Sequence, residues 1–295
     1  MDTSTAVPFN APPASSAQRD GVDMPSLAAR EIERLRARVR ELSAELVDAQ
    51  ESVRRHVARE LHDGVGAELT ATRFALAGIE TWLPADAPPQ CAAALAVANR
   101  SLDAVCAASR EAVAQLHAPS FESGVAGALQ GWIRDFAART DLRTTFTCSD
   151  DARLARLPAD AALALFRVAQ EALNNVAKHA HATCADVRLE TGARHLKLFV
   201  SDDGIGLPRG ARELGGENQA NGHFGLTGMQ ARCTAFDGAL RVSARRAGIG
   251  HGEGSSDGST GAIAPRGTLI QARFAWHALL ADTAAPRTAR RALQS

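Results

Sequence analysis

The sequence has no surplus of charge of either sign, because 33 Lys and Arg residues balance 33 Asp and Glu residues in a chain of 295. A neutral chain has no overall field that would gather DNA, RNA or an anionic membrane, so nucleic-acid binding would require a local basic patch. We find only a short basic stretch, at residues 286–291. We therefore expect no direct nucleic-acid partner.

Cysteine is scarce, and its five positions are odd in number, widely spaced and without a Cys-x-x-Cys pair. This spacing argues against a zinc site and a disulfide scaffold, and is typical of free thiols in a reducing compartment. No continuous apolar run approaches the ~18 to 20 residues that span a bilayer, and the N-terminus lacks the regions of a signal peptide. We therefore expect a cytoplasmic protein without a membrane span.

The first third of the chain changes character twice. Residues 1–25 are rich in Ala, Pro, Ser and Thr without periodicity, which is typical of a disordered tail. From Ile32 to Val53 apolar residues recur at alternating spacings of 3 and 4, a heptad pattern that predicts a coiled-coil dimer. One amphipathic helix packed on its own domain is the alternative. From Val53 to Leu69 the spacing is 4, which is a stutter in the heptad pattern.

A proline-rich turn at 84–89 separates this helical pattern from a second one that ends near Pro119. Two long helices joined by a short loop form a helical hairpin. Two such hairpins can pair into a dimeric four-helix bundle, so the sequence predicts a homodimer.

Beyond residue 121 helices and strands do not alternate strictly, which predicts an α+β fold, a two-layer α/β sandwich with helices on one face of a mixed sheet. Residues 246–265 read as a flexible insertion. The expected helices cover 125–139, 158–180 and 224–236, and the expected strands cover 143–148, 185–190, 195–201, 239–244 and 268–276.

Three short segments carry chemistry. Glu171, Asn175 and Lys178 share one helix face, where a carboxylate, an amide oxygen and an ammonium could serve Mg²⁺ and phosphate; a solvated face is the alternative. An alternating strand then runs into Asp202-Asp-Gly-Ile-Gly206, where a fixed carboxylate suits an exocyclic amine of a base. Glycines of the segment 222–229 open a helix whose free N–H groups can hold phosphate.

Taken together, the segments EALNNVAKH (171–179), DDGIG (202–206) and GHFGLTGM (222–229) resemble the GHKL-type ATP-binding domain of sensor histidine kinases, over about residues 125–276. The resemblance implies ATP and Mg²⁺ as cofactors, with Asn175 binding Mg²⁺, Glu171 polarising its shell or a water, and Asp202 reading the adenine amine. The loop from 203 to 222 would be the lid. The residues implied to bind the nucleotide are Asn175, Lys178, His179, Asp202, Gly204, Gly206, Gly222, Gly225, Leu226, Gly228 and Thr268.

The segment RRHVARELHDGVG (54–66) resembles the phosphoacceptor box of the histidine kinase subfamily that pairs with response regulators bearing helix-turn-helix output domains. The resemblance implies that His62 accepts the phosphoryl group. His62 lies about 100° around the helix from the core position Leu61, so it should be reachable. Its imidazole is largely neutral at pH 7, and Asp63 is placed to accept a proton from the other ring nitrogen.

We therefore predict a dimeric histidine autokinase that passes its phosphoryl group to an aspartate of a response regulator. An ATPase or Ser kinase of the same fold group and a nucleotide-binding scaffold are the alternatives. In the subfamily, an amide side chain four residues after the acidic one is associated with phosphatase activity, and here that position is Ala67. The predicted divisions are a disordered tail (1–25), a coiled-coil helix (26–53), a phosphotransfer hairpin (54–118), an ATP-binding catalytic domain (121–278) and a C-terminal tail (279–295).

Overall fold

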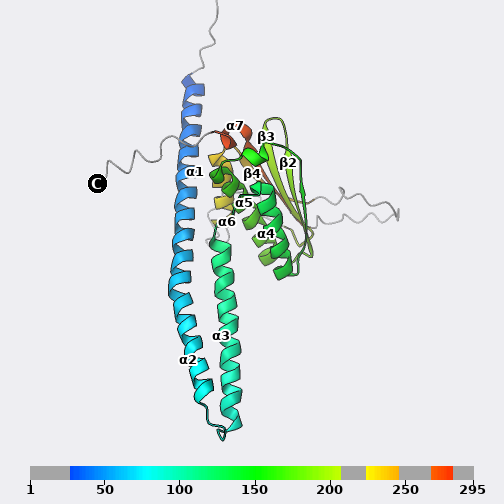
Figure 1. The fold of residues 1–295 in the computed structure, drawn as a ribbon. Helices are drawn as coiled ribbons and strands as arrows, with labels where there is room; N and C mark the ends of the chain where they lie inside the picture. The colour runs from blue at the N-terminus through cyan, green and yellow to red at the C-terminus, as the bar shows by residue number, and fades with distance from the viewer. Residues whose placement is uncertain (1–26, 207–223, 246–266, 282–295) are drawn as a thin grey trace, which may run out of the picture. The chain divides into compact units, whose positions relative to one another are not determined.

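The computed structural model describes residues 27–206, 224–245 and 267–281. The N-terminal tail, most of the lid with Gly222, the insertion at 246–265 and nearly all of the C-terminal tail lie outside the described residues. The described chain begins with helices and continues as an α/β domain, as the sequence predicts (Figure 1).

The N-terminal helix α1 (Leu27–Glu60) continues through a π-helical turn, η1 (Leu61–Val65), into α2 (Gly66–Trp82). The π turn lies where the apolar spacing becomes 4, because a π turn holds more residues than an α turn and keeps those side chains on one side. The chain then turns, with Ala87 N–H donating to Pro84 O at 3.0 Å, and α3 (Pro89–Leu116) begins with a proline at its first position. Helices α2 and α3 lie side by side as a hairpin (Figure 1).

The heptad positions of α1 are uncovered within a single chain. Six large apolar side chains along them are 41–61% exposed: Ile32, Leu35, Val39, Leu42, Leu46 and Val53. An apolar stripe of this length is typical of a helix that packs against a partner surface.

The α/β domain has a five-stranded sheet in the order β1-β2-β3-β5-β4, in which only the β1–β2 pair is parallel. Its strands are β1 (Arg143–Cys148), β2 (Cys184–Thr191), β3 (His195–Asp202), β4 (Ala239–Ala244) and β5 (Thr268–Ala275). Its helices are α4 (Gly124–Thr140), α5 (Ala159–Asn175) with its π-helical extension η3 (Val176–Ala180), and α6 (Phe224–Ala235). The short elements η2 (Leu154–Arg156) and α7 (Trp276–Leu279) were not predicted.

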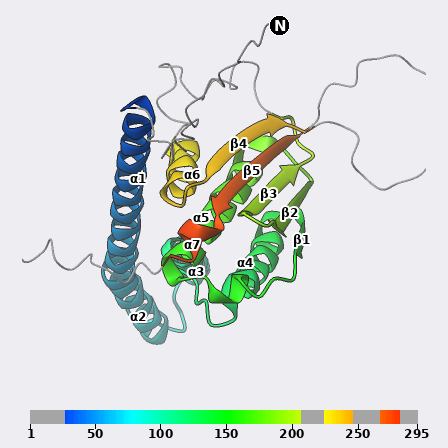
Figure 2. The same cartoon turned by 90° about the horizontal axis from the view of Figure 1, so that it is seen from above.

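One face of the sheet meets the helices (Figure 2). Strand β3 alternates between buried and half-buried residues, and its buried side chains pack with Leu165 and Phe166 of α5 in one core cluster. Because α5 is covered by the sheet and by its neighbouring helices, almost every residue from Ala161 to Gln170 is buried. The predicted site residues Glu171 and Asn175 follow this buried stretch and are half-buried.

The expectation that no segment is long and apolar enough to span a membrane is wrong. Helix α3 has 28 residues, and an 18-residue window of it has a mean hydropathy of 1.3, so by length and composition it could cross a membrane. Leu102 is the one buried residue of α3. No unbroken apolar run marks α3 in the sequence, because its Ala, Val, Leu and Cys residues are interrupted by polar and charged residues such as Arg100 and Asp103.

Candidate functional site

Asp202 lies at the end of β3 and is only 2% exposed. Its Oδ1 accepts hydrogen bonds from the N–H groups of Gly204 at 2.9 Å and Thr268 at 3.1 Å. Burial raises the pKa of the Asp202 carboxyl, and these backbone donors oppose the rise. The carboxylate is thus held in one orientation, as recognition of a base amine requires.

The glycines around Asp202 are explained by close packing of the chain. A Cβ at Gly204 would collide with the carbonyl oxygen of Ala180, which accepts a hydrogen bond from Ile205 N–H at 2.8 Å. Gly267 has a φ of +94°, and a Cβ there would collide with the Asp202 carbonyl. Gly204 therefore lets the end of η3 approach the strand end, in addition to any role toward a nucleotide.

The next residue, Asp203, binds the backbone at the start of β2. Its carboxylate accepts from Thr183 N–H and Cys184 N–H, both at 2.8 Å, and from the Thr183 hydroxyl at 2.7 Å. These bonds fix the start of β2. Asp203 therefore has a structural role, and Asp202 stays the candidate for base recognition.

A second cluster forms at the start of α6. The Glu171 carboxylate lies against Gly225, where a Cβ would meet Glu171 Oε1. Glu171, Gly225 and Gly228 line a cleft of about 480 Å³ together with Arg232 of α6 and with Gln50, Val53 and Arg54 of α1. The structure thus brings together predicted residues of the first and third segments.

The other predicted residues surround this region. Asn175 is half-buried at the last position of α5, and Thr268 and Leu226 are also half-buried. Lys178 and His179 are exposed on the π turn η3, and Gly206 follows the strand end with a φ of +78°. Their roles toward a nucleotide stay predictions.

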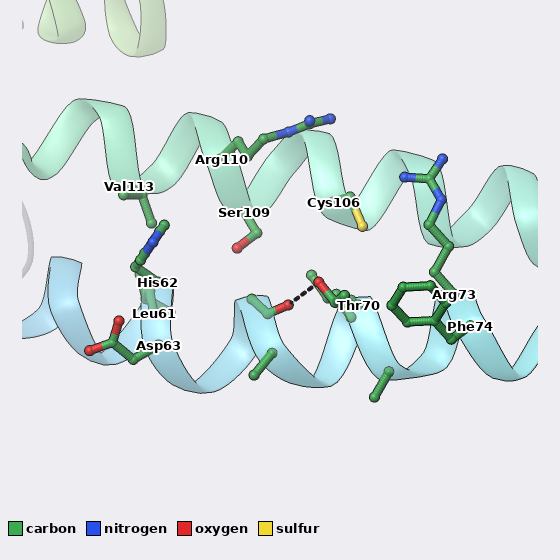
Figure 3. Close-up of a pocket in the computed structure, with 14 residues that line it drawn as sticks. Leu61, His62, Asp63, Thr70, Arg73, Phe74, Cys106, Ser109, Arg110 and Val113 are labelled. Atoms are coloured by element: carbon green, nitrogen blue, oxygen red, sulfur yellow. Dashed lines mark hydrogen bonds between the residues drawn. The ribbon is translucent and has the colours of Figure 1, made fainter.

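His62 lies on the other π turn, η1, and is exposed. It borders a groove of about 800 Å³ lined by α2 and α3, and it points toward Val113 of α3 (Figure 3). Asp63 points away from the imidazole in the same view, so its role as proton acceptor would require another rotamer. Ala67 lines this groove as well, and no described residue of the α/β domain does.

Sequence reasoning missed Arg54, Arg232 and Gln50 as neighbours of Glu171. Residues this far apart in sequence meet only through the packing of α1 on the α/β domain. The one available signal was that Arg54 stands within the segment that resembles a phosphoacceptor box.

Comparison with known proteins agrees with both regions. Residues 160–274 match the family described as histidine kinase-, DNA gyrase B-, and HSP90-like ATPase, and residues 53–121 match the HisKA_3 family, described as histidine kinase. The chain therefore contains an ATP-binding domain of that ATPase class. It belongs to the sensor histidine kinases of two-component systems, in the subfamily with a HisKA_3 region.

Among its relatives, the signal transduction histidine-protein kinase/phosphatase UhpB of Salmonella typhimurium is 34% identical over 70% of this chain and 39% of its own length. The sensor histidine kinase MctS of Rhizobium johnstonii is 34% identical over 72% of this chain and 45% of its own. A solved structure, the mycobacterial sensor histidine kinase MprB, has 22% identity and a TM-score of 0.35 over 54% of this chain and 97% of that one. The chain spans less than half the length of both curated relatives.

The site fits ATP and a metal that arrives with it. Among the described residues no three His, Cys, Asp or Glu side chains are grouped to hold a metal ion. Mg²⁺ is commonly held by one or two protein oxygens and by the phosphates of a substrate. Asn175 is a suitable oxygen ligand for a metal of that kind.

Asp202→Asn should weaken ATP binding by roughly tenfold or more, because the amide replaces an acceptor oxygen with a donor facing the adenine amine. Asp203→Asn is the matched control, and it should lower thermal stability through the start of β2 with little change in ATP affinity. Calorimetric titration with ATP and thermal unfolding would measure the two effects. Equal ATP affinities for Asp202→Asn and the parent protein would assign base recognition to another residue.

Proposed function

We propose that this chain is an ATP-dependent histidine autokinase that phosphorylates His62 and passes the phosphoryl group to an aspartate of a response regulator. The observation that carries the proposal is the presence, in one chain, of an exposed histidine in a HisKA_3 region and a buried Asp202 in an ATPase-type site. An ATPase or Ser kinase of the same fold group would need no such histidine.

In this reaction one ring nitrogen of His62 forms a bond to the γ-phosphorus while the bond to the β,γ-bridging oxygen breaks, and ADP leaves. Mg²⁺, when bound, neutralises charge on the phosphate oxygens. We assign Asn175 to the metal, Glu171 to its hydration shell or a water, and Lys178 and His179 to phosphate or ribose. Asp63 would accept the proton of the second ring nitrogen after rotating toward it.

His62 and Glu171 line two different cavities, so the proposed phosphoryl transfer requires the two residues to approach. We propose that the divisions at 26–53, 54–118 and 121–278 are the parts that move. We also propose that the kinase region works in the cytoplasm, where ATP is available.

The exposed apolar stripe of α1 supports a dimeric coiled coil that continues into a four-helix bundle of two hairpins. The stimulus would then reach His62 along one helix path, since α1, η1 and α2 follow one another without a break.

Incubation with γ-labelled ATP should label the parent protein, and the label should be lost on acid treatment and survive base. His62→Gln should abolish the label, whereas His56→Gln, which changes an exposed histidine on the same helix path, should retain it. Nucleotide binding by the His62→Gln protein serves as the folding control. Undiminished label in His62→Gln would refute the assignment of the acceptor.

Ala67→Gln should raise the rate at which the phosphorylated response regulator is dephosphorylated, because an amide in the groove of His62 can orient a water that alanine cannot. Autophosphorylation should change little. Decay of purified phospho-regulator in the presence of ADP measures the effect. A fast parent rate that is indifferent to the substitution would show that another group positions the water.

Val39→Glu together with Leu42→Glu should weaken dimerisation and autokinase activity. The added negative charges would face the same charges of the second chain across the paired apolar stripes of α1, which form the seam of the dimer. Ala37→Glu adds a charge to an exposed position of the same helix outside the seam and should leave the dimer intact. Sedimentation equilibrium and the labelling assay measure both. An unchanged, active dimer in the Val39 and Leu42 variant would show that the stripe does not hold the dimer together.

A further inference from the structure

The cleft at the start of α6 contains more positive charge than its neighbours neutralise. Arg54, Arg167 and Arg232 approach one another there, accompanied by the carboxylates of Glu51 and Glu171. Glu51 is committed to Arg167 through two hydrogen bonds, of 3.2 and 2.6 Å. The two carboxylates offset two of the three positive charges, so a net positive charge remains.

Arg232 is buried without a full set of partners. It is 4% exposed, and its Nε has no hydrogen-bond partner in the structure. Burial lowers the pKa of the Arg232 guanidinium to about 10, and the nearby charge of Arg54 acts in the same direction. A buried guanidinium with an unused donor is costly unless an acceptor fills the place.

The side chain of Arg232 is directed into the cleft. Its Nη1 lies 3.0 Å from the position that a Cβ of Gly228 would occupy, and Gln50 Oε1 of α1 lies 3.4 Å from the same position. The cleft also contains Gly225, in the first turn of α6, where backbone N–H groups have no partner within the helix. Both guanidiniums and the first turn of α6 therefore border the same cleft.

Burial also lowers the pKa of the Arg54 guanidinium, and repulsion by the charge of Arg167 lowers it further. Arg54 belongs to α1, whereas Arg232 and Gly225 belong to α6, so the cleft closes only when α1 lies against the α/β domain. An anion bound there would relieve the repulsion between the arginines and would join the two elements. The negative charge of Glu171 would repel a bare anion. The cleft therefore favours an anion that binds together with a cation, as ATP does with Mg²⁺.

We propose that this cleft binds the terminal phosphate of ATP, with Arg54 from α1 and Arg232 from α6 as positioning residues that distinguish ATP from ADP. The proposal rests on the proposed autokinase function and adds a helix of the phosphoacceptor region to the nucleotide site. Bound ATP would then hold α1 against the α/β domain, and ADP would hold it less well.

Arg54→Gln in the full chain should weaken ATP binding by roughly ten- to a hundredfold, the effect of losing a charge-assisted hydrogen bond, and should leave ADP binding within about twofold. Arg59→Gln, an exposed arginine on the same helix that does not line the cleft, should change neither. Calorimetric titrations with Mg-ATP, Mg-ADP and inorganic phosphate alone measure the three affinities. Arg232→Gln should reproduce the loss for ATP, provided that its thermal unfolding remains cooperative.

A purely structural role for the arginines would lower stability without changing the ratio of ATP to ADP affinity, and this outcome would overturn the proposal. Saturable binding of inorganic phosphate that Arg54→Gln abolishes, with an unchanged ATP to ADP ratio, would also overturn it by assigning the cleft to free phosphate. A parent protein that binds no ATP would instead refute the autokinase function itself.

Discussion

The described structure depends on the burial of one guanidinium. Arg167 of α5 is 2% exposed, and its five N–H donors are all used: two on Glu51 of α1, two on the carbonyl oxygens of Gln115 and Leu116, and one on Gln170. The carbonyls belong to the last turn of α3, whose backbone acceptors have no partner within the helix. Removing one partner of such a buried pair typically costs about 3–5 kcal/mol, because the other charge stays desolvated. Arg167 therefore joins the helical region to the ATP-binding region, together with the Arg40–Asp237 and Arg139–Glu111 ion pairs.

Most of the α/β domain could be predicted from the sequence because its signals are local. Strands β1 and β4 have the predicted bounds, and β3 and β5 differ from prediction by one residue at one end. The alternation of Leu196, Leu198 and Val200 specifies which face of β3 is buried, and the core contains all three. Asp202 was predicted to be fixed at the strand end, and two backbone donors fix it there.

The features that could not be predicted from the sequence depend on long-range packing or on hydropathy averaged over long windows. The Glu51–Arg167 pair joins residues 116 apart, and no periodicity in either helix indicates it. The helix predicted at 158–180 changes to π geometry at Val176, because the chain must bring Ala180 against Ile205. The apolar character of α3 was missed for a different reason: its hydropathy is distributed over 18 residues, and no continuous run exists. Both π turns carry residues assigned to chemistry, as π turns often do.

The position of Arg54 on α1 constrains how the kinase can work. His62 follows Arg54 by eight residues, which corresponds to roughly 12 Å along a helix. A phosphate held by Arg54 is therefore out of reach of His62 on the same helix path while α1 remains in the described position. Because α1 continues through η1 into α2, His62 and Arg54 move together, and a shift of α1 cannot bring one closer to a fixed phosphate without displacing the other. Transfer then requires the ATP-binding region to travel along the helix, or the histidine of a second chain to approach. In either case the arrangement that holds ATP differs from the one that transfers its phosphate, and a signal that moves α1 selects between them.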